Sequence, residues 1–278
     1  ITSAGISLLN ISTSESRLLY SNTTEDFFQV PSLYYDDQLK RLWIGTGSAG
    51  LFYYDIIRKS LSDIPIRNFP KQPILAIRKD AKNTLLIGID GQGIWNISEK
   101  GDTILHIYKE DLNNPFSLRG DGVYDILCDG SKNWIATFTG KLSFFENNNS
   151  QITPVTYQIN NPNSLGNNYV NQIIEDHEGH IWFATNNGVS RWDAASNKWK
   201  HYYQNKSEQA KVFLSLCEDN QGHIWAGSYS SGIYLLDRET GKTLKHYSSK
   251  TNTPGFTGDF IFDFFVDKEG DVWIGGNQ

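Results

Sequence analysis

The sequence contains one short motif that returns at a nearly constant interval along the chain. Its clearest copies run from Asp176 to Trp182, from Asp219 to Trp225 and from Asp267 to Trp273, and each follows the pattern D-x-x-G-x-[IV]-W. With weaker copies included, the tryptophan position recurs at residues 43, 86, 134, 182, 225 and 273. A period of about 40 to 50 residues is typical of a repeat protein in which each copy forms one supersecondary unit.

Three copies depart from the pattern but keep the aspartate at its start. In the copy Asp37 to Trp43, Lys40 stands at the glycine position, and in the copy Asp80 to Leu86, Asn83 stands there. The copy Asp129 to Trp134 is one residue shorter. Glycine adopts a positive φ at little cost, asparagine tolerates one, and aspartate accepts hydrogen bonds from the amides of its own turn. The motif therefore predicts a tight turn between two strands.

Short apolar segments surround every copy of the motif in the same order. One segment precedes the aspartate, as in Ile74–Ile77, and another follows the tryptophan after a small polar turn, as in Gly232–Asp237. A last short segment ends in an aromatic residue, as at Tyr203 and Tyr247. Four short strands per period, with turn residues between them, indicate an antiparallel all-β fold. A four-stranded unit of this length is the blade of a β-propeller.

We therefore predict an all-β fold for residues 1–278, as a single β-propeller domain of four-stranded antiparallel blades with six repeats. The segments Gly5–Asn10 and Arg17–Tyr20 match the outer two strands of a blade, and Asp259–Gly276 matches the inner two. Because joining them would hide exposed strand edges, we expect the N-terminal strands to complete the C-terminal blade and close the ring. The repeated tryptophans should pack between neighbouring blades.

The composition excludes two classes of partner. The formal net charge is −6 at pH 7, whereas a protein that binds nucleic acid needs a basic surface. No run of 18 apolar residues occurs, so no stretch is long enough to span a bilayer. The sequence therefore predicts a soluble segment that does not bind nucleic acid. Because it begins at Ile1 and contains no methionine, we interpret it as part of a longer protein.

The sequence contains no recognisable catalytic motif. No G-x-S-x-G nucleophile elbow occurs, and a glycosidase needs two carboxylates in one cleft, which sequence alone cannot pair. Five of the six histidines occupy shared repeat positions, with His180 and His223 before the tryptophan and His106, His201 and His246 in the last strand. Such positions favour packing over metal binding. We expect no catalytic residue, no metal site and no cofactor.

A ligand site is expected on one face of the propeller. There the loops between second and third strands meet the loops that lead to the next blade, and their residues are rich in amides with a few aromatic rings. Such a surface suits sugars, because amides bind hydroxyl groups and aromatic faces cover C–H patches. The alternative is that these residues serve only their turns. The loops 113–121 and 160–169 are the longest. The candidate ligand-binding residues are Asp90, Arg119, Asp121, Phe138, Asn167, Asn168, Tyr169, Asn186, Asn187 and Tyr229.

The repeat resembles a known family. Its motif, together with the linker Asn-Pro-x-Ser-Leu at Asn114–Leu118 and Asn161–Leu165, is similar to the two-component regulator propeller repeat over essentially the whole chain. This repeat occurs in the periplasmic sensor regions of hybrid two-component histidine kinases from polysaccharide-degrading bacteria. The resemblance implies a periplasmic location, a membrane-anchored and homodimeric parent protein, and an oligosaccharide ligand. It also implies propellers of seven blades, one more than the six repeats counted here.

We therefore expect a ligand-sensing propeller that responds to oligosaccharides and regulates polysaccharide utilisation. Kinase signatures are missing from this sequence, so we expect the segment itself to have no enzymatic activity. One alternative is a protein-interaction scaffold without a small ligand, which a large exposed apolar patch would favour. A second alternative is a carbohydrate-active hydrolase or lyase, which a pair of carboxylates in a central cleft would favour.

Overall fold

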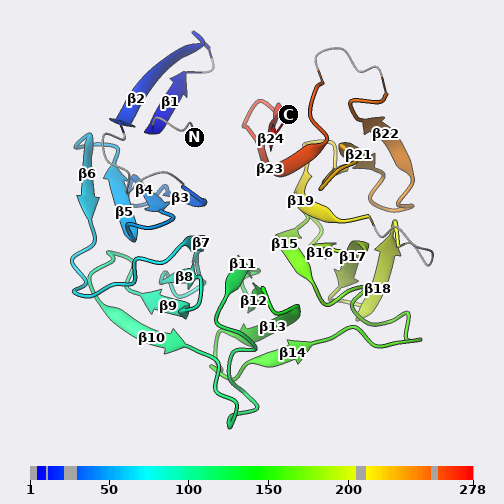
Figure 1. Cartoon of the computed structure of the whole chain (residues 1–278), viewed down its shortest axis with the longest axis horizontal. Helices are drawn as coiled ribbons and strands as arrows, with labels where there is room; N and C mark the ends of the chain where they lie inside the picture. The colour runs from blue at the N-terminus through cyan, green and yellow to red at the C-terminus, as the bar shows by residue number, and fades with distance from the viewer. Residues whose placement is uncertain (1–4, 11, 22–29, 205–210, 252–255, 278) are drawn as a thin grey trace. The chain divides into compact units, whose positions relative to one another are not determined.

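The computed structural model describes residues 5–10, 12–21, 30–204, 211–251 and 256–277 of the chain. In these residues every regular element is a β-strand, as the sequence predicts (Figure 1). Across the same residues, no helix has the length and apolarity that crossing a membrane requires. The chain divides into two compact units, residues 1–133 with 146–152 and residues 134–145 with 153–278. The single domain that we expected stays a prediction.

The described residues form five four-stranded antiparallel sheets, each with its strands in chain order. The first is β3 (Ser32–Asp36), β4 (Arg41–Gly45), β5 (Leu51–Asp55) and β6 (Ser60–Asp63). The second is β7 (Ile74–Lys79), β8 (Leu85–Ile89), β9 (Gly93–Ile97) and β10 (Ile104–Tyr108). The third is β11 (Val123–Cys128), β12 (Lys132–Thr137), β13 (Lys141–Glu146) and β14 (Thr153–Val155). The fourth is β15 (Val170–Glu175), β16 (Ile181–Thr185), β17 (Gly188–Asp193) and β18 (Lys198–Tyr202). The fifth is β19 (Phe213–Glu218), β20 (Ile224–Ser228), β21 (Ile233–Leu236) and β22 (Thr243–Tyr247).

Two further sheets have two strands each. They are β1 (Gly5–Asn10) with β2 (Glu15–Ser21), and β23 (Phe260–Val266) with β24 (Val272–Asn277). These are the half-blades that the sequence predicts at the two ends, and closure of the ring by their pairing stays a prediction. Within each unit the first strands of successive sheets lie side by side, as β3 lies beside β7 and β15 beside β19 (Figure 1).

The repeated aspartate organises the turn between the first two strands of each sheet. In the fourth sheet Asp176 accepts hydrogen bonds from the Glu178 and His180 amides at 3.0 and 2.9 Å, and its other oxygen accepts the indole N–H of Trp182 at 2.8 Å. Burial would raise the pKa of Asp176, but the hydrogen bonds from Trp182 and His180 outweigh it and lower this pKa. Gly179 has the expected positive φ of 82°. The motif is therefore a turn clamped to its own tryptophan.

The same indole bond recurs in the two other clear copies. Trp225 donates to Asp219 at 2.9 Å, and Trp273 donates to Asp267 at 2.7 Å. In the second sheet Leu86 replaces the tryptophan, and the hydroxyl of Thr84 donates to the free oxygen of Asp80 at 2.9 Å. A different side chain thus satisfies the same carboxylate oxygen. Asn83 has the predicted positive φ of 60°.

The first sheet corrects one prediction. Lys40, at the glycine position of the motif, has a positive φ of 51°. The turn aspartate, however, is Asp36, which is 2% exposed and accepts two turn amides at 3.0 and 3.1 Å. Asp37 points to solvent and pairs with Lys40 at 2.7 Å. Because the turn is one residue longer, Trp43 does not reach the carboxylate, and its indole N–H has no partner among the described residues.

The repeated tryptophans pack between neighbouring sheets, as predicted. Trp182 of β16 is fully buried and belongs to a core cluster with Phe213 and Leu216 of β19. Trp43 of β4 packs in the same way against Ile74 of β7. Trp273 is 40% exposed, although it keeps its bond to the turn aspartate. The motif fixes the local turn, and burial of the ring depends on the following sheet.

Candidate functional site

Three equivalent side chains, two of them candidate ligand residues, hold the connection between successive sheets. Asp121 accepts the Glu110 amide at 2.7 Å, Asn168 accepts the Tyr157 amide at 2.7 Å, and Asp259 accepts the Ser249 amide at 2.7 Å. In each case the side chain lies just before the first strand of one sheet. It binds a backbone amide that follows the last strand of the preceding sheet. Asp121 and Asn168 therefore have a structural role in the repeat.

The other candidate amides are also engaged in their own loops. Asn167 accepts the Tyr169 amide at 2.9 Å, which is the local turn bond expected of asparagine. Asn186 accepts the side-chain amide of Asn171 at 2.9 Å, and its backbone N–H donates to the Tyr169 carbonyl at 3.0 Å. The Asn187 amide donates to the Thr185 hydroxyl at 3.1 Å. The structure thus brings Tyr169 and Asn186 together and places most of these polar groups in turns.

The aromatic candidates are exposed and lie on neighbouring loops. Tyr169 is 51% exposed and rests on the loop that contains Phe138, where Gly140 leaves room for its ring. Tyr229 is also 51% exposed, and its ring lies 4.2 Å from that of Phe260, centroid to centroid. The sequence did not single out Phe260. Tyr169, just before β15, thus contacts the loop of the preceding sheet, and Phe260, the first residue of β23, contacts Tyr229 of the preceding sheet's loop.

The two remaining candidates lie in the first unit. Arg119 donates through its guanidinium to the carbonyl oxygen of Pro115, within the first Asn-Pro-x-Ser-Leu linker. Asp90 follows β8, and its charge contributes, after burial, to a raised pKa of Tyr124. No contact joins Asp90 to Arg119 among the described residues, so the structure does not gather them into one site.

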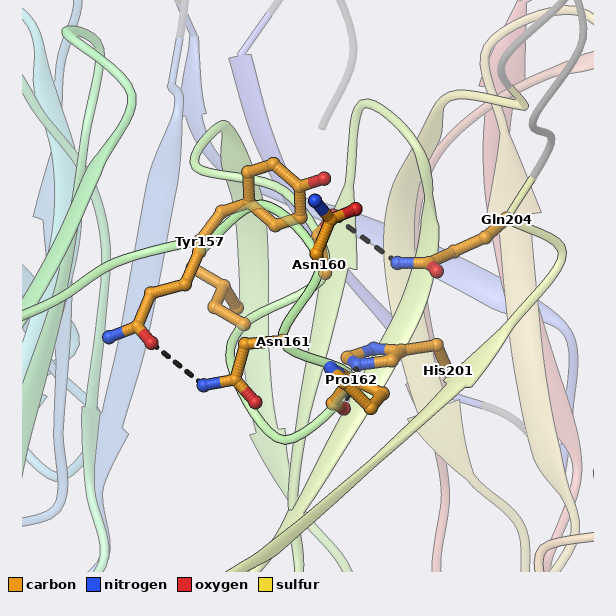
Figure 2. A pocket seen from close by; sticks show the side chains of 9 residues that line it. Tyr157, Asn160, Asn161, Pro162, His201 and Gln204 are labelled. Carbon is orange, nitrogen blue, oxygen red and sulfur yellow. Dashed lines mark hydrogen bonds between the residues drawn. The ribbon is translucent and has the colours of Figure 1, made fainter.

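The linker before β15 forms a pocket of about 430 Å³ against the end of β18. We call it the linker pocket. Figure 2 shows its side chains, with Tyr157 and Asn160 on one side and His201 and Gln204 on the other. The pocket is lined by Tyr157, Gln158, Asn160, Asn161, Pro162, Leu165, Gly166, His201 and Gln204. Asn160–Gly166 fall within a loop that the sequence favoured, but none of the lining residues was a named candidate.

The linker is rigid because its own side chains hold it. Asn161 accepts the Asn163 amide at 3.0 Å, and the Ser164 hydroxyl accepts the Gln158 amide at 3.0 Å while it donates to the Asn161 carbonyl at 2.9 Å. Leu165 is fully buried. The repeated Asn, Ser and Leu therefore fold the linker and leave its outer residues to face the pocket.

A chain of hydrogen bonds fixes the imidazole of His201. Its Nε2 lies 3.2 Å from the Pro162 carbonyl oxygen, which can only accept, so Nε2 carries the proton. The Ser190 hydroxyl lies 3.1 Å from Nδ1 and donates to it, and this hydroxyl accepts the Gly166 amide at 3.2 Å. Burial lowers the pKa of His201, and the carbonyls of Pro162 and Ser164 oppose that effect only in part. His201 is therefore neutral at neutral pH.

The contact between Ser190 and His201 is structural. A serine nucleophile must reach its substrate and needs a base that a third group orients. Ser190 is completely buried, and the other nitrogen of His201 faces a backbone carbonyl, at 3.2 Å. The described residues that line the pocket include no carboxylate. The pair therefore shapes the wall of the pocket.

Gly166 makes room for the linker pocket. A Cβ atom on Gly166 would lie 2.4 Å from Gln204 Nε2, 2.6 Å from Ser190 Oγ and 2.8 Å from His201 Nδ1. In the first linker the equivalent residue is Arg119, whose guanidinium bonds to Pro115. The Pro115 carbonyl is equivalent to the Pro162 carbonyl, which accepts the hydrogen bond from His201 in the second linker. An arginine thus occupies in one linker the place that glycine leaves open in the other.

Two sequence signals could have indicated this pocket. One is the exchange of Arg119 for Gly166 between two otherwise similar linkers. The other is His201, which we assigned to repeat packing on an exposed strand. It does lie in β18, but its ring is half-buried and lines the pocket. Neither signal shows that the linker folds against the end of β18, because that contact joins distant parts of the sequence.

Comparison with known proteins identifies the repeat. Residues 164–187, 207–230 and 255–278 match the model of the family described as two component regulator propeller. The first match includes β15 and β16, and the second includes β19 and β20. No curated protein matches the sequence.

Solved structures share the fold at low sequence identity. The WD40 β-propeller domain of Doa1 is 13% identical, with a TM-score of 0.67 over 94% of this chain and 79% of that chain. The computationally designed Ika8 protein is 12% identical, with a TM-score of 0.64 over 99% and 78%. A domain designated as the extracellular domain of the hybrid two-component system BT3049 from B. thetaiotaomicron is 19% identical, with a TM-score of 0.56. This chain aligns over 98% of its own length and spans 40% of that domain. The fold is a β-propeller of four-stranded antiparallel blades.

Proposed function

We propose that this chain, which carries two-component regulator propeller repeats, is the ligand-sensing part of an extracytoplasmic sensor. Its ligand is an oligosaccharide, and binding regulates polysaccharide utilisation. The parent protein is periplasmic in this part, membrane-anchored and homodimeric. The observation that carries the proposal is the linker pocket, a preorganised concave site whose residues Leu165 and Gly166 belong to the first segment that matches the regulator-propeller model.

The size and rigidity of the pocket support ligand binding. Its volume of about 430 Å³ lies within the range of about 300 to 1,000 Å³ that is usual for small-molecule sites. The hydrogen bonds of Asn161, Ser164 and His201 fix its walls before any ligand arrives. A preformed site loses little conformational freedom on binding, so more of the contact energy contributes to affinity.

Sensing also requires that the ligand distinguish two arrangements of the parent protein. A ligand with equal affinity for both arrangements shifts nothing. The linker pocket joins the connection between the third and fourth sheets to β18, the outer strand of the fourth sheet. A ligand there can bias how these sheets pack. The ligand would then signal by binding one arrangement of the dimer more tightly than the other and so increasing its population.

Calorimetric titration with a panel of oligosaccharides tests the proposal. We expect one class of glycan to bind, and we expect Asn160→Gly to weaken it, because glycine keeps the positive φ of 64° at this position and removes only the amide. Asn113→Gly is the matched control in the first linker, where Arg119 occupies the equivalent place. Failure of every glycan to bind a folded sample would remove the proposal.

The interaction scaffold is the second candidate, and one observation favours it. Ile104, Leu105 and Ile107 of β10 are each 37 to 52% exposed along the outer strand of the second sheet. Exposed apolar side chains on an edge strand favour contact with another protein. If glycans fail to bind, the partner should be sought at β10. The alternative of a hydrolase or lyase is not favoured by the linker pocket, whose described lining contains no carboxylate.

A further inference from the structure

The linker pocket is neutral throughout its described lining. The side chains that line it are amides, a phenol, an imidazole, a proline ring and a leucine, together with Gly166. Proteins bind carboxylate and sulfate groups through arginine or lysine, which supply charge and several N–H donors. The equivalent place in the first linker holds Arg119, so the repeat can accommodate a cation there. In the second linker glycine replaces it.

The imidazole does not supply the missing charge. Nε2 of His201 donates to Pro162 at 3.2 Å, and Nδ1 accepts from Ser190 at 3.1 Å. A proton on Nδ1 would reverse the hydrogen bond with Ser190, whose hydroxyl would have to accept, and would place a charge in a partly buried wall. Burial lowers the pKa of His201 for the same reason. The pocket therefore has a neutral wall at neutral pH.

The polar groups that remain free include both donors and acceptors. Asn160 has no side-chain partner among the described residues, and the same holds for the hydroxyl of Tyr157. Gln158 accepts from Asn161 at 2.7 Å, which leaves its NH₂ free, and Gln204 donates to the Gly166 carbonyl at 3.2 Å, which leaves its oxygen free. Sugar hydroxyls both donate and accept, so they satisfy this mixture. A carboxylate or sulfate only accepts and would face unpaired oxygens.

The pocket also offers an apolar face to a sugar ring. Tyr157 is 43% exposed, and the ring of Pro162 lies next to the His201 imidazole in Figure 2. Aromatic faces cover the C–H patches of sugars while the hydroxyl groups bind amides. At about 430 Å³ the volume suits a mono- or disaccharide unit at the end of a chain.

We propose that the linker pocket selects the terminal unit of a neutral glycan and excludes uronic acids and sulfated sugars. The inference rests on the proposed function, which it narrows to one chemical class. The neutral lining and the mixture of free donors and acceptors carry it.

Matched pairs of oligosaccharides test this selection in calorimetric titrations of the protein. Each pair has the same length and linkage, and one member carries a carboxylate or sulfate on its terminal unit. We expect the neutral member to bind about tenfold or more tightly than its anionic counterpart. Its affinity should change little between about 0.05 and 0.5 M salt, because no ion pair is screened.

Variants locate the selection in the pocket. Asn160→Gly should weaken the neutral glycan by about three- to tenfold, the range for loss of one neutral hydrogen bond. Asn160→Lys should recruit the anionic glycan and make its affinity depend on salt, whereas Asn113→Lys in the first linker should not. Circular dichroism of each variant verifies that the sheets have formed.

The outcomes separate the two proposals. Tighter binding of the neutral member, weakened at Asn160, supports the inference. Tighter binding of an anionic member, also weakened at Asn160, overturns the inference and leaves the sensing function in place. Absence of binding by both members of every pair, with all proteins folded, overturns the sensing function together with the inference.

Discussion

Replacing Trp182 by alanine tests whether the repeated tryptophans hold neighbouring sheets together. Trp182 is completely buried and packs against Phe213 and Leu216 of the next sheet. An aromatic ring of this kind buries on the order of 200 Å², worth roughly 5 kcal/mol at about 25 cal/mol per Å². Partial collapse of the cavity reduces this value, so we expect Trp182→Ala to lower the free energy of unfolding by about 3–5 kcal/mol.

Trp273→Ala is the matched control. Trp273 occupies the same motif position and donates the same indole bond to its turn aspartate, at 2.7 Å against 2.8 Å for Trp182. It is, however, 40% exposed. Both variants lose the same hydrogen bond, so its contribution cancels when their losses of unfolding free energy are compared. The remaining difference measures the burial of the ring. We expect Trp273→Ala to cost about 1–2 kcal/mol, because less area is lost and solvent fills the space.

Urea denaturation followed by far-ultraviolet circular dichroism measures both variants, since fluorescence would change with the removed chromophore. The midpoint should fall much further for Trp182→Ala than for Trp273→Ala at a similar slope. Equal losses in the two variants would refute the reasoning, because the hydrogen-bonded turn alone would then account for the stability that the motif contributes.

Three further predictions concern the turns and the linker. Burial opposes ionisation of Asp219, but hydrogen bonds from Trp225 and the turn amides lower its pKa below the ordinary value of 3.8. Since the folded pKa is the lower one, the carboxylate stabilises the fold above its ordinary pKa of 3.8, and this contribution is lost as the pH falls below that value and through the folded pKa. Asp219→Asn should flatten the acid limb of a stability profile, and an unchanged limb would contradict this. Gly166→Ala should destabilise the fold and abolish glycan binding, because its Cβ would lie 2.4 to 2.8 Å from three side chains, whereas Gly275→Ala meets only one atom at 3.6 Å and should change the melting temperature little. Lys40→Gly should stabilise by about 0.5–1 kcal/mol, because glycine accepts the φ of 51° without strain; a lower urea midpoint would show that the side chain contributes more than its backbone costs.

The fold could be predicted because the same pattern of strands and turns recurs several times along the sequence. Glycine or Asn83 at one fixed position of the turn indicates where the backbone takes a positive φ, and Asn83 does; Lys40 at the same position also does, although its side chain gave no such indication. The choice between Asp36 and Asp37 could not be made in this way. The motif spacing favours Asp37, whereas the structure uses Asp36, which is buried and accepts the turn amides.

The candidate site was predicted less completely, for a physical reason. Amide-rich loops serve their own turns as readily as a ligand, and Asn167 and Asn168 are both engaged in this way. The linker pocket arises from contact between a linker and the end of a strand far along the chain. Sequence spacing carries no information on such a contact, although the exchange of Arg119 for Gly166 is consistent with it.

Hydrogen exchange measured by mass spectrometry, with and without a glycan that binds, tests the central claim most directly. Amides that a ligand covers or stiffens exchange more slowly. We predict that protection concentrates in residues 157–166 and 198–204, around the linker pocket. Protection confined to the loops of Tyr169 and Tyr229, with the linker unchanged, would contradict this account and place the ligand on the face with the exposed aromatic rings.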